Sequence, residues 1–137
     1  MKKLLAALVL LCIMTTLFVA CGGGATGAPC PTGRCSPTNT NGTVHLGVSN
    51  FDQPSVTIGK GGTLTLVDDG ANVHNINNGS WVNGVAHPLK ETGAPTVSNL
   101  MFSTASQKQV IGPFNTAGTF HLYCSIHTGM NLSIIVK

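Results

Sequence analysis

Residues 119–130 read Thr-Phe-His-Leu-Tyr-Cys-Ser-Ile-His-Thr-Gly-Met and contain the spacing Cys-x-x-His-x-x-Met. Cys124, His127 and Met130 therefore offer a thiolate, an imidazole and a thioether within seven residues. The two kinds of sulfur suit a copper ion that alternates between Cu(I) and Cu(II), and imidazole suits both states. A blue copper centre also needs a second His in its ligand plane. His74, fifty residues before Cys124, can supply it, so the fold must bring two distant segments together.

These two segments resemble the cupredoxin family of small blue copper proteins. The resemblance rests on Val-His-Asn-Ile at residues 73–76 and Tyr-Cys-Ser-Ile-His-Thr-Gly-Met at residues 123–130, and the likeness spans roughly residues 43–137. It implies one type 1 copper ion with three ligands in a plane and an axial Met: His74, Cys124, His127 and Met130. It also implies that Asn75 and Ser125 form hydrogen bonds that hold the ligands in position. Ile126 stands where many relatives carry proline.

From Thr43 onward, apolar residues recur with a period of two, which is typical of half-buried β-strands. In residues 43–48 this period places Val44, Leu46 and Val48 on one face and His45 on the other. Residues 55–58 and 63–67 flank a Gly-Gly turn, which indicates a hairpin or a tight strand connection. About seven to eight strands with short turns predict an all-β sandwich, and the resemblance makes it a Greek-key, cupredoxin-like one.

Residues 77–108 show the weakest pattern. Turn signals and two prolines break any long helix there, and we expect a long excursion between strands with a short helix at most. Within it, His87 is an alternative copper ligand to His74, although the following proline favours a loop. Trp81 and Met101 are expected to serve packing. After the excursion, the strand that ends at Cys124 directs His121 away from the metal, because side chains alternate along a strand.

The first twenty residues have the features of a bacterial lipoprotein signal. Two lysines precede an apolar stretch too short and wrongly flanked for a membrane span, and Cys21 follows small residues and precedes three glycines. We therefore expect cleavage before Cys21 and a lipid on its thiol, which would anchor the protein outside the cytoplasm. The alternatives are an ordinary secreted or periplasmic protein, or an uncleaved anchor.

Residues 21–42 are rich in Gly, Pro, Thr and Asn and predict a flexible tether between the anchor and a domain at residues 43–137. Within the tether, Cys30 and Cys35 are expected to form a disulfide outside the cytoplasm. The alternative is a redox or metal-binding pair.

The net charge of the chain argues against nucleic-acid binding. Loss of Lys2 and Lys3 with the signal leaves five basic residues against four acidic ones, a net charge of +1. The chain has no basic stripe for nucleic acid.

The sequence predicts a monomeric carrier of single electrons that is not an enzyme and that meets a donor and an acceptor redox protein transiently. Ile126, with Leu100 or Met101, would form the docking patch beside His127. Two other functions stay open. A copper transfer or storage protein would hold the metal in an open site, and a copper enzyme component would need further His ligands. Zinc is a weaker alternative because a Met ligand suits it poorly.

Overall fold

A computed structural model describes residues 40–137 of the chain. The predicted signal at residues 1–20, the lipid on Cys21 and the Cys30–Cys35 disulfide lie outside the described residues, and so does most of the tether. These assignments remain predictions. The first strand begins at Gly42, one residue before the expected start of the domain.

The described part of the chain is built from strands and short turns, and residues 40–137 contain no helix. Consequently, this part has no helix long and apolar enough to cross a membrane. The ten strands are β1 (Gly42–Leu46), β2 (Ser55–Ile58), β3 (Leu64–Asp68), β4 (His74–Asn78), β5 (Ser80–Val82), β6 (Val85–His87), β7 (Leu100–Phe102), β8 (Lys108–Ile111), β9 (Gly118–Cys124) and β10 (Asn131–Val136).

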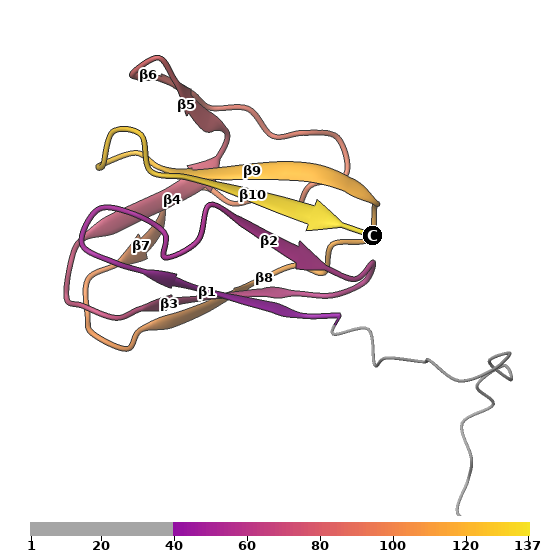
Figure 1. Ribbon diagram of the computed structural model, residues 1–137, viewed down its shortest axis with the longest axis horizontal. Helices are drawn as coiled ribbons and strands as arrows, with labels where there is room; N and C mark the ends of the chain where they lie inside the picture. Colours follow the sequence, from indigo (N-terminus) through magenta and orange to yellow (C-terminus); the bar gives the residue numbers. More distant parts are fainter. Residues whose placement is uncertain (1–39) are drawn as a thin grey trace, which may run out of the picture. The chain divides into compact units, whose positions relative to one another are not determined.

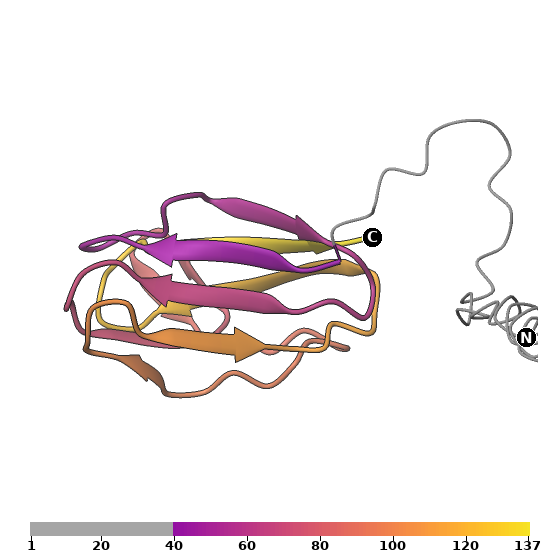
Figure 2. The same ribbon diagram turned by 90° about the horizontal axis from the view of Figure 1, so that it is seen from below.

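Two sheets form a sandwich, as predicted. One sheet has the order β1-β3-β8 and the other has the order β2-β10-β9-β4-β7. Figure 1 shows the two layers, and in Figure 2 the arrows of β1, β3 and β8 lie in front of β9 and β10. The chain crosses repeatedly between the layers, and the pairs β1–β3 and β2–β10 are parallel while the other pairs are antiparallel. The Greek-key sandwich is therefore confirmed; its two sheets hold eight strands, and the hairpin β5–β6 is additional.

The core lies between the two sheets and follows the period-two pattern. Strand β10 alternates strictly between buried and half-buried residues. On β9, Phe120, Leu122 and Cys124 share the buried face, as predicted, whereas His121 points the other way and is half-buried. Tyr123 on the outer face is buried as well, because the β5–β6 hairpin covers it: the rings of Trp81 and Tyr123 meet edge to face, 6.0 Å apart.

Two local predictions at the start of the domain need correction. Val48 was predicted to share the core face of Val44 and Leu46, but it is 71% exposed. The strand ends at Leu46, and a turn closed by the bond from Gly47 N to Asn50 O breaks the alternation. The hairpin alternative for residues 55–67 was also wrong. Strands β2 and β3 belong to different sheets, so the Gly61–Gly62 turn is the tight connection that joins the two layers.

The excursion at residues 77–108 contains more strand than predicted and no helix. It holds β5 and β6, which pair only with each other in the described region, and then β7, which adds to the edge of the larger sheet beside β4. The turn between β5 and β6 is Asn83-Gly84, and both residues have a positive φ. Asn-Gly is the preferred sequence for this kind of two-residue hairpin turn, so the turn signal at Asn83-Gly84 is confirmed, whereas the short helix expected in the excursion is absent from the described residues.

Candidate metal centre

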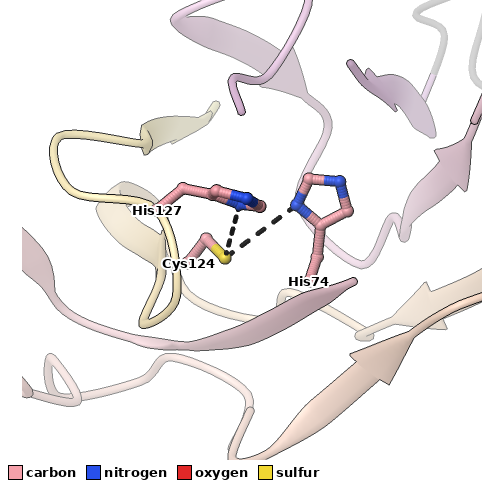
Figure 3. A group of neighbouring side chains, drawn as sticks. All are labelled: His74, Cys124 and His127. Carbon is pink, nitrogen blue, oxygen red and sulfur yellow. Dashed lines mark hydrogen bonds between the residues drawn. The ribbon is translucent and has the colours of Figure 1, made fainter. Parts of the chain in front are cut away.

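The sheet places His74 and Cys124 at one end of two neighbouring antiparallel strands. His74 is the first residue of β4, Cys124 is the last residue of β9, and Ile76 pairs with Cys124 across the two strands. The start of one strand therefore lies beside the end of the other. His127 follows three residues after Cys124 on the connecting loop to β10. Figure 3 shows the three side chains converging from these two segments.

The three donor atoms have the spacing of a metal site. Cys124 Sγ lies 3.5 Å from His127 Nδ1 and 3.9 Å from His74 Nδ1, and all three donors lie within 4.8 Å of one another. Metal bonds of about 2.3 Å to sulfur and about 2.0–2.1 Å to nitrogen, at trigonal angles, would separate sulfur from nitrogen by roughly 3.8 Å. One thiolate and two imidazoles at this spacing fit a copper ion.

A tight turn that begins at His127 carries the chain back into the core at Met130. Met130 N donates to His127 O at 3.2 Å, and Gly129 at the third position of this turn has a φ of +82°. Glycine adopts that conformation without steric cost, as a type II turn requires. Met130 is buried, and its carbonyl accepts a hydrogen bond from Cys124 N at 3.1 Å. The loop therefore closes on itself at Cys124, with His127 at its partly exposed outer edge.

Asn75 and Ser125 do join the two ligand segments, but through atoms other than the side-chain amide. Ser125 N donates to the Asn75 carbonyl at 2.9 Å, and Ser125 Oγ lies 3.4 Å from the same oxygen. The Asn75 amide instead donates to Asn99 Oδ1 and accepts from Asn77 Nδ2. The backbone of the residue after His74 thus holds the residue after Cys124.

Burial lowers the pKa of His74 below its ordinary value of 6.5, and the nearby His127 lowers it further. The Asp68 carboxylate and the Gly47 backbone oppose this shift in part. Asp68 is fully buried; its Oδ1 accepts from Gly70 N, whereas Asp68 Oδ2 and His74 Nε2 make no hydrogen bond of standard geometry within residues 40–137. A neutral imidazole is the form that binds a metal. The lowered pKa therefore favours the form of His74 that can bind one.

The lowered pKa of His74 predicts a pH-dependent stability of the metal-free protein. The folded state binds a proton at His74 less readily than the unfolded state does. The contribution of neutral His74 to the free energy of unfolding is therefore complete above about pH 6.5 and is lost as the pH falls through the lowered pKa. Each unit of lowering is worth about 1.4 kcal/mol. Urea unfolding at about pH 7.5 and about pH 5 should show a larger loss of stability in the wild type than in His74→Gln. Equal losses in the two proteins would contradict this prediction.

The other described histidines lie away from this cluster. His45 Nδ1 and Asp69 Oδ1 are 2.6 Å apart, and His121 Nδ1 and Glu91 Oε1 are also 2.6 Å apart. His87 ends β6 and is exposed. The only group of His, Cys, Asp or Glu in residues 40–137 arranged to hold a metal is His74, Cys124 and His127, so His87 is not brought to the site as an alternative to His74.

Trp81 is the site residue that sequence reasoning missed. It was expected to serve packing, but its indole Nε1 donates to the carbonyl of Cys124 at 2.8 Å. Its backbone exchanges two hydrogen bonds with the side chain of Asn131, the residue after Met130. The Asn83-Gly84 turn could have revealed the hairpin that carries Trp81. Its position beside the ligand loop depends on tertiary packing.

Comparisons with known proteins identify the fold. No family model matches the chain, and no curated protein matches it either. Solved structures of amicyanin, a cupredoxin, share the fold with a TM-score of 0.52. The amicyanin of Paracoccus versutus is 24% identical over 69% of this chain and 79% of its own. A reduced amicyanin variant, and another in the reduced Cu(I) form at pH 4, are each 19% identical over 69% of this chain and 80% of theirs.

Proposed function

We propose that this protein is a type 1 copper protein that carries single electrons between redox partners. The observation that carries the proposal is the convergence of Cys124 Sγ on the Nδ1 atoms of His127 and His74, at 3.5 and 3.9 Å, on a cupredoxin fold. The amicyanins that share this fold include reduced Cu(I) and oxidized forms. The same pair of states is what a single-electron carrier needs.

Each residue has a distinct role in the proposal. The Cys124 thiolate and the neutral imidazoles of His74 and His127 would hold the copper ion, and the thioether of the buried Met130 would be a further, weaker ligand. Bound copper would supply the one-electron chemistry, accepting an electron as Cu(II) and releasing it as Cu(I). The chain contributes fixed positions: His74 and Cys124 stand on paired strands, so neither needs to move when the charge changes.

One edge of the site is open to a partner. His127 is partly exposed, and Ile126 beside it is 48% exposed, as is Val73 beside His74. Met101 lies on the edge strand β7, where it pairs with Asn75 of β4, and it is also exposed. Its neighbour Leu100 packs against the core instead. We therefore assign the docking patch to Ile126, Val73 and Met101. A small apolar patch fits a redox protein that binds transiently and leaves quickly.

A carrier is favoured over an enzyme because the remaining described histidines offer no second metal. His45 and His121 are each paired with a carboxylate, and His87 lies apart from both. The proposal retains the extracytoplasmic location of a monomer tethered by a lipid on Cys21, with Cys30 and Cys35 joined in the tether. These parts rest on the sequence pattern alone.

Electrochemistry tests the carrier function. The purified protein, loaded with one equivalent of Cu(II), should give a reversible one-electron wave at an electrode, and the metal should stay bound when a Cu(I) chelator is present during repeated cycles. A reversible wave that disappears with loss of copper to the chelator would instead identify a copper transfer protein. Turnover of a reductase or oxidase substrate without a redox partner would identify an enzyme.

A further inference from the structure

The β5–β6 hairpin contacts the ligand segment at the point where β9 ends. The hairpin lies outside both sheets of the sandwich (Figure 1), yet Trp81 on its first strand meets Tyr123 edge to face. Tyr123 immediately precedes Cys124 and is buried under this contact. The hairpin therefore covers the backbone that carries the thiolate rather than the open edge of the site at His127.

Trp81 is hydrogen-bonded to both ends of the ligand loop. Its indole Nε1 donates to the Cys124 carbonyl at 2.8 Å, which is the first end. Its backbone N donates to Asn131 Oδ1 at 2.7 Å, and its carbonyl accepts from Asn131 Nδ2 at 3.0 Å, which is the second end. Cys124 and Asn131 bound the loop of residues 125–130, so a single residue of the hairpin ties the two boundaries together.

The loop has little else to hold its middle. Within it, one bond joins Cys124 N to the Met130 carbonyl and another joins Met130 N to the His127 carbonyl. Ser125 is tied to Asn75, but Ile126, Thr128 and Gly129 are exposed. No proline stiffens the segment from Cys124 to Met130. The Cys124 N–H is held within the loop by the Met130 carbonyl, whereas the Cys124 carbonyl is held from outside it, by the indole N–H of Trp81.

We propose that Trp81 is a positioning residue for the metal centre: through the Cys124 carbonyl and Asn131 it fixes both ends of the ligand loop, so that Cys124 and His127 keep one geometry in both oxidation states. The effect on copper rests on the proposed function, whereas the hydrogen bonds of Trp81 to the loop do not depend on it. Ligands that stay in place lower the structural rearrangement that accompanies each electron, because less of the site must move. The β5–β6 hairpin thus acts as an external brace on the loop.

Trp81→Phe tests the brace, because it removes the indole N–H while keeping an aromatic ring against Tyr123. In the metal-free protein, amide hydrogen exchange at Ser125 and Met130, the loop residues whose N–H groups are hydrogen-bonded, should quicken by roughly 2- to 10-fold, as expected for loss of one hydrogen bond. In the copper-loaded protein, the electron self-exchange rate should fall and the visible and EPR spectra of Cu(II) should shift. The matched control, Val82→Ala, alters the exposed neighbour on the same strand and should leave exchange and spectra unchanged.

A second variant, Asn131→Asp, tests the same brace without changing Trp81. Asn131→Asp keeps the acceptor for Trp81 N and loses the donor to the Trp81 carbonyl, so it should quicken exchange in the same loop by a smaller factor. Unchanged loop exchange and unchanged copper spectra in Trp81→Phe, or in Asn131→Asp where the first variant does not fold, would overturn the inference. Failure of the wild type to form a blue copper centre would overturn the proposed function instead, while the metal-free exchange measurement would still decide whether the brace exists.

Discussion

Replacement of Cys124 by serine should abolish the intense visible band of the copper-loaded protein. In a blue copper site the colour comes from charge transfer between the thiolate and Cu(II), and Cys124 is the only thiol among the described residues. The two imidazoles remain in Cys124→Ser, so Cu(II) should still bind, with the weak absorption and the larger EPR hyperfine splitting of an ordinary tetragonal site. The reversible one-electron wave should disappear with the band.

The matched control for this change is Ser125→Ala. It removes the neighbouring side-chain oxygen, which makes only a 3.4 Å contact with the Asn75 carbonyl, and leaves the 2.9 Å backbone bond from Ser125 N in place. The variant should keep its blue colour. An intense band that persists in Cys124→Ser would show that the thiolate of Cys124 is not the source of the colour, and the assignment of the site would be wrong.

Phe102→Ala should cause a large loss of stability, because Phe102 is among the largest fully buried side chains of the core. Phe102 is fully buried and pairs with His74 across β7 and β4, so the two side chains are neighbours on the inner face of the sheet. Truncation of a buried Phe costs about 3–5 kcal/mol. For a domain of this size that loss lowers Tm by at least about 12 °C. Thermal or urea unfolding of the metal-free protein measures both values.

The control for Phe102→Ala is Val110→Ala, which removes an apolar side chain that is 66% exposed on β8. Surface changes of this kind stay within about 0.5 kcal/mol. A loss of less than about 1 kcal/mol in Phe102→Ala would contradict the packing of the core, since no buried Phe in a tight interior is truncated so cheaply. Because a bound metal adds stability by mass action, both variants must be compared without copper.

The proximity of His74, Cys124 and His127 could be predicted because local chemistry and strand geometry both constrain it. Cys124 and His127 are three residues apart on one loop, so no long-range packing is needed to place them together. Alternation along β9 separated Cys124 from His121 correctly. His74 was harder, since its distance from Cys124 depends on which strands become neighbours. The thiolate and thioether pattern supplied that constraint by demanding a second imidazole.

The predictions failed where tertiary contacts override local pattern. Val48 continues the alternation of β1 in the sequence, but Leu46 ends the strand and a turn follows. The Gly61–Gly62 turn has the composition of a hairpin, yet its two strands pair with β10 and β1 in opposite layers. Composition at a turn does not encode the sheet that each strand joins.

The hydrogen bonds that hold the backbone around the candidate metal site were the least predictable part. Ser125 bonds to Asn75, but through the Asn75 backbone carbonyl, and no sequence pattern distinguishes such a bond from one made by the side chain. Trp81 lies 43 residues from Cys124 along the chain. A lone Trp is most often a packing residue, and only the folded hairpin aims its indole N–H at the Cys124 carbonyl.

The most direct test of the central claim is a titration of the purified metal-free protein with Cu(II), followed by visible and EPR spectroscopy. The proposed site predicts an intense blue or green thiolate band that saturates at one equivalent, a small copper hyperfine splitting, and reversible bleaching by ascorbate. A protein that stays colourless or absorbs only weakly at saturation would contradict the assignment of His74, Cys124, His127 and Met130 as a type 1 copper centre.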